Sequence, residues 1–368
     1  MKILYDHQIF RAQPYGGVSR YFFELASRLS ARNECDVEIF APLYVNEYLD
    51  KASDIRIWGK QFPRYPYTGY LQNGVNACLT RLMVKPRKDI DIFHETFFTR
   101  ANNGPRSAKR LLTVYDMIHE KLPDFCSNSG HFQARKAIAV KRADHIICIS
   151  ENTRSDLISI LNVPEAKISV VYLGHSLSCP PDAIRPVAHE KPFVLYVGNR
   201  EGYKNFTLLL RAFASSQLLK EDFSIVCFGG GKATPGEMDL VTSLGLAANA
   251  VDFVAGDDSV LAGLYASAKA FVYPSLYEGF GIPPLEAMAF GCPVVCANTS
   301  SLPEVVGDAA ELFDPESETD LRAAMEKVVF LPGHAEWLIA MGRERIKRFS
   351  WEKCAQETLA VYENVLGE

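Results

Sequence analysis

Residues 274–295 read PSLYEGFGIPPLEAMAFGCPVV, a pattern that predicts a strand end, a glycine-bearing loop and a helix in succession. The apolar run Phe271–Tyr273 precedes it, and Gly279 and Gly281 would let the loop backbone approach a ligand closely. Pro283 favours a helix start there, because the first helical turn does not need the N–H that proline lacks. The pattern therefore predicts an anion site suited to a diphosphate, where the loop meets the helix.

Two carboxylates, Glu278 and Glu286, bracket this loop with seven residues between them. A carboxylate beside a phosphate site cannot be a phosphate ligand, because like charges repel. We therefore predict that both accept hydrogen bonds from sugar hydroxyls on either side of the diphosphate. A strand–helix turn with two solvated glutamates would show the same spacing, so spacing alone leaves both interpretations open.

Similar strand–helix units extend in both directions from this stretch. Near-continuous apolar strands that alternate with helices indicate parallel sheets covered on both faces. The 19 residues 174–192 carry four prolines without periodicity, which predicts a linker. The expected class is α/β, with two Rossmann-like doubly wound domains, 1–180 and 181–349, facing each other across a cleft. Strands are expected at Ile3–Tyr5, Val37–Ala41, Ile90–His94, Arg110–Tyr115, His145–Ile149, Ser169–Tyr172, Phe193–Val197, Phe223–Phe228, Val251–Val254, Ala270–Tyr273 and Val294–Ala297.

Composition excludes several classes of protein. With 368 residues and 48% hydrophobic residues, the chain is neither mainly disordered nor too short for two cores. The net charge of −5 hides an asymmetry: residues 1–180 hold 24 Lys and Arg against 18 Asp and Glu, and the rest of the chain is acidic. This balance argues against general nucleic-acid binding. The nine scattered cysteines, without a CxxC pair, indicate reduced thiols in a cytoplasmic protein without a zinc site, and we expect neither a signal peptide nor a spanning helix.

Three further glycine or cation motifs fall at predicted strand ends. In FVLYVGNREGYKN, 193–205, Arg200 and Lys204 could neutralise a diphosphate leaving group, although a solvated loop is an equal alternative. Gly16 and Gly17 precede a predicted helix, which again allows close backbone approach. The sequence FGGGK, 228–232, is compatible with a nucleotide lying against the backbone and equally with a tight turn.

The first half adds candidate polar residues at the carboxyl ends of two predicted strands. His94, Asp116 and His119 follow predicted strands and could orient a substrate or accept a proton, although a lone histidine is more often structural. The segment 64–88 is rich in aromatic, apolar and basic residues, which is typical of a membrane interface and also of an ordinary helix with snorkelling cations. The cations relevant to membrane contact are Arg81, Lys85, Arg87 and Lys88.

The segment from Glu278 to Glu286, followed by GCPVV and by SSLPEVVGDAA at 300–310, resembles the retaining glycosyltransferases of family 4. YGGVSRYF and DMIHE are similar to bacterial surface-polysaccharide members of that family. The resemblance covers nearly the whole chain. It implies a GT-B fold, a nucleotide diphosphate sugar as donor, retention of the anomeric configuration, no required metal or other cofactor, and a last helix, 350–368, that joins the first domain.

The resemblance also implies roles for single residues. Glu278 would bind the donor sugar, and Glu286 would hold the ribose. The diphosphate would be held by Arg200 and Lys204, with help from backbone at Gly17 and 280–282. The base would lie near Phe253. The remaining donor-site candidates are Gly16, Gly279, Phe280, Gly281 and Ile282.

The chain departs from the family pattern at two positions. Many members have a histidine where this chain has Tyr115, followed here by Asp116 and His119, and the family's phosphate-binding arginine falls on Asn199, one residue before Arg200. We expect GDP-mannose or a related donor, with a UDP-glucose or UDP-N-acetylhexosamine enzyme and a non-catalytic sugar-nucleotide-binding subunit as alternatives. The acceptor would be a glycan or a lipid-linked glycan, reached at the inner face of the cytoplasmic membrane.

Overall fold

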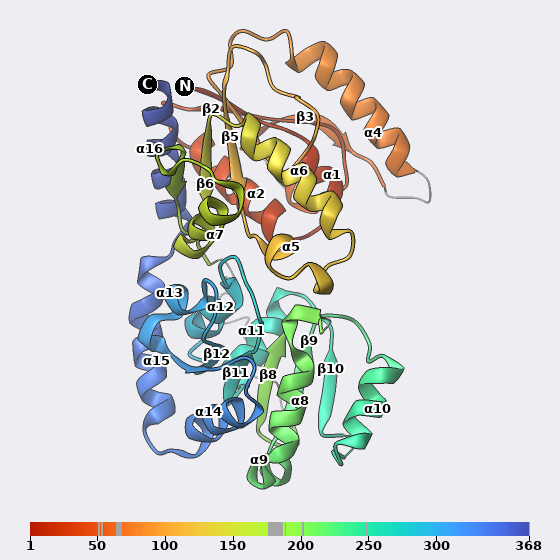
Figure 1. Ribbon diagram of the computed structural model, residues 1–368, viewed down its shortest axis with the longest axis vertical. Coiled ribbons are helices and arrows are strands. Elements are labelled where there is room, and N and C mark those ends of the chain that lie inside the picture. Colours follow the sequence, from red (N-terminus) through yellow and green to blue (C-terminus); the bar gives the residue numbers. More distant parts are fainter. Residues whose placement is uncertain are drawn as a thin grey trace. The chain divides into compact units, whose positions relative to one another are not determined.

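The chain forms two compact units in the computed structural model, which describes residues 1–50, 52, 54–63, 68–175, 187, 189–200, 202–247 and 249–367. Unit 1 comprises Met1–Gly174 and Trp351–Glu368, and unit 2 comprises His175–Ser350. Each unit is a parallel sheet with helices on its faces, so the predicted α/β class is confirmed (Figure 1). Most of the predicted linker, 176–186 and 188, lies outside the described residues.

Unit 1 has a seven-stranded parallel sheet in the order β3-β2-β1-β4-β5-β6-β7. From β1 the chain builds outward in one direction to β3, and from β4 it builds in the other direction to β7. The strands are β1 (Lys2–Tyr5), β2 (Asp36–Tyr44), β3 (Arg56–Gln61), β4 (Ile92–Glu95), β5 (Lys109–Val114), β6 (His145–Cys148) and β7 (Ile168–Val170). The helices are α1 (Gln8–Ala12), α2 (Gly17–Ser30), α3 (Glu47–Asp50), α4 (Thr68–Leu79), α5 (Ile118–Lys121), α6 (Ser129–Arg142), α7 (Glu151–Leu161) and α16 (Trp351–Gly367).

Unit 2 has a six-stranded parallel sheet in the order β10-β9-β8-β11-β12-β13. Its strand order reverses between β8 and β11, which are neighbours in the sheet. The strands are β8 (Phe193–Val197), β9 (Ser224–Phe228), β10 (Val251–Val254), β11 (Ala270–Tyr273), β12 (Val294–Ala297) and β13 (Ala310–Phe313). The helices are α8 (Phe206–Ser215), α9 (Gln217–Asp222), α10 (Pro235–Ser243), α11 (Asp258–Ser267), α12 (Ile282–Ala289), α13 (Leu302–Val306), α14 (Glu318–Phe330) and α15 (His334–Arg345).

Two strands, β3 and β13, were not predicted from the sequence. Both are edge strands that pair with a single neighbour. Strand β3 is RIWGKQ and is mostly exposed, so it lacks the apolar run that marks a strand covered on both faces. Strand β13 is AELF, in which a glutamate interrupts a four-residue segment. The edge strands β7 and β10 were predicted, so the polar residues within β3 and β13, and not edge position alone, hid these two strands.

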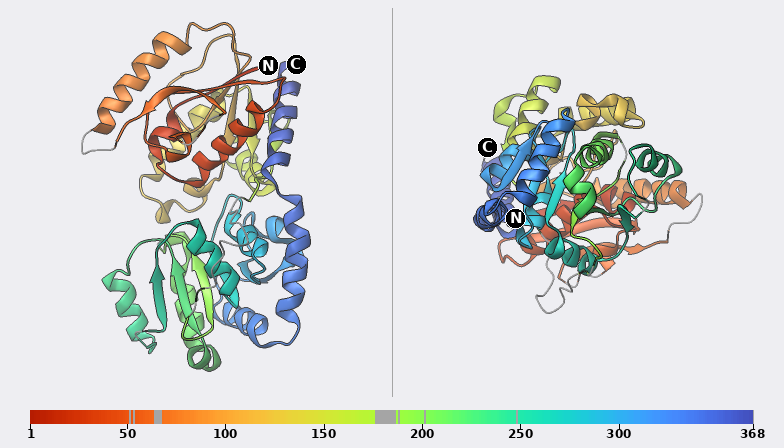
Figure 2. Two further views of the ribbon diagram at one scale, coloured as in Figure 1. Left: turned by 180° about the vertical axis from the view of Figure 1, so that it is seen from behind. Right: turned by 90° about the horizontal axis from the view of Figure 1, so that it is seen from below.

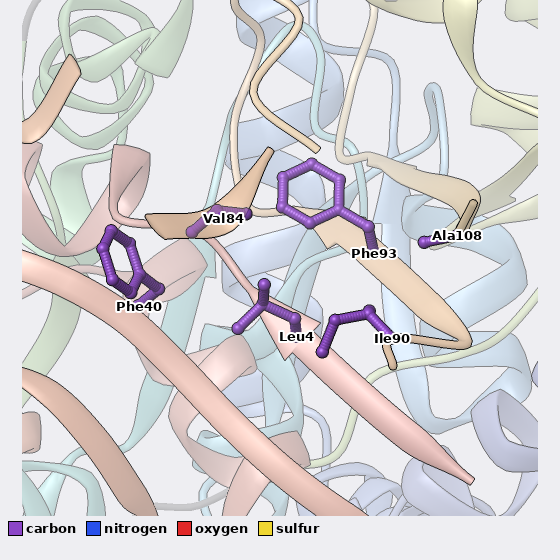
Figure 3. Packing of buried hydrophobic residues seen from close by; sticks show 6 residues of the cluster. All are labelled: Leu4, Phe40, Val84, Ile90, Phe93 and Ala108. Carbon is purple, nitrogen blue, oxygen red and sulfur yellow. The ribbon is translucent and has the colours of Figure 1, made fainter. Parts of the chain in front are cut away.

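Apolar side chains from separated segments form the core of unit 1. Leu4 of β1, Phe40 of β2 and Phe93 of β4 belong to one cluster of buried residues (Figure 3). Val84 joins them from a π-helical turn, Thr80–Val84, that directly follows α4. This contact anchors the end of α4 to the sheet.

The last helix, α16, completes unit 1, and both chain termini lie in this unit (Figures 1 and 2). Its Tyr362 hydroxyl lies 2.7 Å from His94 Nδ1 and 3.1 Å from the Tyr5 hydroxyl. His94 Nε2 lies 2.9 Å from the Thr113 hydroxyl. Both ring nitrogens of His94 are therefore occupied inside the unit, and burial lowers the pKa of His94 to about 3. In this structure the buried His94 fastens α16 to the sheet.

Candidate active site

The loops after β8 and β11 meet where the strand order of unit 2 reverses. Ligands bind at such a switch point, outside the carboxyl ends of the strands. The backbone N–H of Leu276 donates to the carbonyl of Tyr203 over 2.8 Å and so ties the two loops together. This contact brings a cation from one loop beside a carboxylate from the other.

Lys204 and Glu278 form an ion pair at this point, with 2.6 Å between Lys204 Nζ and Glu278 Oε1. Their side chains are 18% and 13% exposed, so a ligand can still reach them. The rings of Tyr203 and Tyr273 lie 5.1 and 5.4 Å from the ammonium group. Burial alone would lower the pKa of Lys204, but the Glu278 charge outweighs it and the pKa is raised. Lys204 therefore stays protonated at neutral pH.

Two serines that the sequence analysis did not single out fix the Glu278 loop. Ser300 Oγ accepts from the Glu278 N–H over 2.9 Å. Ser301 Oγ donates to the carbonyls of Glu278 and Phe280, at 2.9 Å each. Ser301 is fully buried, so its hydroxyl stabilises the loop from the interior of unit 2. Both belong to the SSLPEVVGDAA segment, whose family resemblance was the signal that could have found them.

Helix α12 begins directly after this loop. Gly281 is its N-cap, with a left-handed φ of 112°, and a Cβ there would lie 2.8 Å from Leu302 Cδ2. Glycine is required for both reasons. Two of the first four helical residues are prolines, so only the N–H groups of Ile282 and Leu285 remain as donors. Glu286 is 7% exposed on the second turn, and Phe280 packs against Phe349.

Arg200 lies apart from the Lys204–Glu278 pair. Its guanidinium donates to Glu237 and to backbone carbonyls of the FGGGK loop, and it lies 4.7 Å from the centre of the Phe253 ring. Only 3% of its side chain is exposed. In this conformation Arg200 presents no open face to a diphosphate. Phe253 lies in β10, next to the strand that carries this loop.

The glycine pair at residues 16 and 17 begins helix α2 in unit 1. Gly16 is the N-cap in an extended conformation, and a Cβ there would lie 2.3 Å from Gln13 Oε1. Gln13 Oε1 accepts from the Ser19 N–H over 3.2 Å and so occupies one helix donor. No atom lies within 4 Å of a Cβ built on Gly17. The helix start is therefore open at Gly17.

Asp116 lies in the loop after β5 and His119 in the short helix α5 that follows, and Lys136 holds this segment in place. Lys136 is 1% exposed, and its ammonium donates to the Asp116 carbonyl over 2.8 Å and to Glu120 over 2.7 Å. The Asp116 side chain is 37% exposed and accepts from the Ile118 N–H. Burial lowers the pKa of His119, whose ring packs 4.5 Å from that of Phe132. Both lie in unit 1, so the structure groups them with neither Lys204 nor Glu278.

Metal ligands do not gather at these positions: among the described residues, no group of three or more His, Cys, Asp or Glu side chains could hold an ion. No helix in the described ranges has the length and apolar character needed to cross a bilayer.

Two family models match the two parts of the chain. One, described as "Glycosyltransferase Family 4", matches residues 15–178, and the other, "Glycosyl transferases group 1", matches residues 182–345. The chain belongs to family 4 of the glycosyltransferases. The predicted enzyme class and GT-B fold of this glycosyltransferase are thereby confirmed.

Individual proteins agree with this assignment. The glycosyltransferase is 28% identical to the O-antigen chain mannosyltransferase B of Escherichia coli over 98% of its own length and 99% of that protein. A sucrose-phosphate synthase structure from Thermosynechococcus elongatus matches all of the chain and 99% of its own, with a TM-score of 0.74 and 20% identity. An Anabaena protein crystallised with UDP and glucose matches 99% of each chain, with a TM-score of 0.72 and 19% identity. These two structures show a shared fold.

Proposed function

We propose that this glycosyltransferase moves a mannosyl residue from GDP-mannose, with retention, to a glycan or lipid-linked acceptor in surface-polysaccharide assembly. The observation that carries the proposal is the Lys204–Glu278 pair at the switch point of unit 2. A cation there suits the donor diphosphate, and an adjacent carboxylate suits the sugar hydroxyls. The full-length similarity to an O-antigen mannosyltransferase supports the choice of mannose.

The two members of the pair have different tasks in this proposal. As the bond from sugar C1 to the phosphate oxygen breaks, negative charge grows on the leaving diphosphate. A protonated Lys204 stabilises that charge more in the transition state than in the ground state. Glu278 accepts hydrogen bonds from the sugar, and Glu286 from the ribose. The acceptor oxygen bonds to C1 on the face that the diphosphate leaves, and the acceptor proton passes to the diphosphate.

Residues of unit 1 would serve the acceptor. We propose that Asp116 orients an acceptor hydroxyl, because its carboxylate is partly exposed on a loop that the buried Lys136 makes rigid. We propose a lesser role for His119, whose ring faces Phe132. The open backbone at Gly17 would approach the donor phosphates when the enzyme is loaded.

Contact with a membrane surface is proposed for α4 and the turn that follows it. The residues of this segment that face the protein are polar at Gln72, Asn76 and Thr80 and apolar at Val84, and the Asn76 amide bonds both backbone groups of Leu43. Large apolar side chains instead face outward: Tyr70 is 83% exposed, and Leu71, Leu82 and Met83 are also exposed. A helix that faces water with its apolar side suits an interface.

The cations beside this surface are not equivalent. Arg81, Lys85 and Lys88 are exposed, whereas Arg87 is tied to Glu38 at 2.6 Å and to Asp89 at 2.7 Å. Arg87 therefore stabilises unit 1, and only the other three cations are available to an anionic lipid surface. Residues 64–67, at the start of the predicted basic segment, lie outside the described residues.

The test of the proposed function is a thermal-shift panel of nucleotides and sugar nucleotides, followed by a transfer assay. At a fixed ligand concentration, tighter binding raises the apparent stability more, so GDP-mannose should rank above UDP-glucose and UDP-N-acetylglucosamine. GDP release and an α-linked product on addition of acceptor support retaining transfer. Binding without nucleotide release indicates a regulatory subunit, and a preference for UDP-sugars contradicts the choice of mannose.

A further inference from the structure

The Arg200 side chain makes a set of contacts within the protein that a residue binding phosphate would not need. Its Nη1 donates to the Gly229 carbonyl over 2.7 Å. Its Nη2 lies 3.3, 3.2 and 3.0 Å from the carbonyls of Gly230, Gly231 and Lys232. One guanidinium thus lies within hydrogen-bond distance of four successive carbonyl groups.

This convergence depends on the glycines. Gly229, Gly230 and Gly231 have φ values of 88°, 69° and 76°, in the left-handed region that glycine occupies without strain. In a trans peptide the N–H points opposite to the C=O. Because the carbonyls of residues 229–231 face Arg200, the N–H groups of residues 230–232 face away from it. These three donors lie at the carboxyl end of β9, beside the strand that leads to Lys204.

Glu237 completes the arrangement from helix α10. Its Oε1 accepts from Arg200 Nε over 2.6 Å, and its Oε2 accepts from the Thr234 N–H over 2.7 Å as part of a capping box. The Phe253 ring covers the guanidinium. If Arg200 turned toward a diphosphate, it would leave a carboxylate and several carbonyls without their donor. The Glu237 carboxylate, 18% exposed, would lose its cation, and the carbonyls of the exposed loop would lose the side chain that holds them together.

We propose that Arg200 is a positioning residue that holds the loop 229–232 so that its N–H groups face the nucleotide of the donor. The proposal rests on the donor binding proposed above for unit 2. It assigns the direct phosphate contact to Lys204 and not to Arg200. It also gives a physical reason for the departure from the family pattern, because Arg200, one position beyond Asn199, is turned toward the glycine loop.

Glu237→Gln separates positioning from direct phosphate binding, because the two roles predict opposite effects. The one amide oxygen of glutamine can keep the capping box with the Thr234 N–H, and the NH2 that then faces Arg200 Nε cannot accept its hydrogen bond, so the contact that fixes Arg200 is lost. If Arg200 positions the loop, Glu237→Gln weakens GDP binding by about fivefold to tenfold. If Arg200 binds phosphate itself, the loss of a competing carboxylate leaves GDP binding unchanged or tighter, which overturns the proposal.

Arg200→Lys supplies a second measurement. An ammonium keeps the charge but cannot fork to four carbonyls and a carboxylate. We expect GDP affinity to fall at least about tenfold and exchange of the Gly229 N–H, which donates to the Val254 carbonyl over 3.2 Å, to accelerate. Lys204→Met is the matched control, which should weaken GDP binding without accelerating that exchange. Near-wild-type GDP affinity in Arg200→Lys overturns the proposal.

All variants are compared as the full chain, with thermal unfolding as the check on folding. If the wild-type chain binds neither GDP nor UDP, donor binding by unit 2 fails and the positioning role fails with it. If the wild-type chain binds and the variants match it, only the positioning role fails.

Discussion

Replacement of Lys204 by methionine tests the central pair of unit 2 in two independent ways. Methionine retains most of the apolar stem and removes the ammonium, so the packing against Tyr203 and Tyr273 changes little. Glu278 then stays in its loop, 13% exposed and without its cation. The loop cannot easily release it, because Ser300 and Ser301 hold its backbone.

The expected loss of stability follows from that burial. Breaking a buried ion pair on one side costs ~3–5 kcal/mol, and partial exposure of this pair reduces the expected loss to about 2–3 kcal/mol. Lys204→Met/Glu278→Gln removes the stranded charge and should recover most of this loss. Transfer should fall ~100-fold or more in both variants, because the charge that stabilises the leaving diphosphate is absent.

Urea unfolding and initial transfer rates measure the two effects. Lys327→Met serves as a control in the same unit, because Lys327 pairs with Glu311 at 2.9 Å but is 46% exposed. It should lose at most about 1 kcal/mol and keep its activity. Equal stability of single and double variants would refute the buried pair, and normal transfer by Lys204→Met would refute its role at the diphosphate.

Gly281→Ala should cost about 2–3 kcal/mol of stability, because the left-handed φ and the Leu302 contact both oppose a Cβ. The control Gly74→Ala in α4, where no atom lies within 4 Å of a new Cβ, should be neutral or stabilising in the same thermal scans. His94 has a folded pKa of about 3 and an unfolded pKa near 6.5, so the unfolded state binds more protons between these values and stability falls as pH falls. Between pH 6.5 and 5 this lowers the free energy of unfolding by about 2 kcal/mol. His94→Asn should flatten that part of the curve of unfolding free energy against pH, measured by urea unfolding at each pH. An unchanged slope would contradict the burial of His94. Charge reversal of three exposed cations should reduce sedimentation with anionic vesicles at least about tenfold, since each contributes ~1 kcal/mol, and unchanged binding would exclude this surface. The cations are Arg81, Lys85 and Lys88.

The sequence by itself determined the α/β class, the two-domain organisation and the loop that carries Glu278. These features are local: apolar strands, helix periods and glycines at turns are all encoded by neighbouring residues. The same local logic could not detect β3 or β13, because polar residues break the apolar run in both of these edge strands. It also left His94 open between a functional and a structural role.

Only the tertiary structure decided which side chains meet. Lys204 and Glu278 are 74 positions apart and form a pair because β8 and β11 are neighbours in the sheet. Arg200 and Lys204 share one loop, yet one faces the glycine carbonyls and the other faces Glu278. His94 is fixed by Tyr362, 268 positions away. Residue type and spacing along the chain determine which chemistry is available, but contact depends on strand order and side-chain direction, which the fold alone sets.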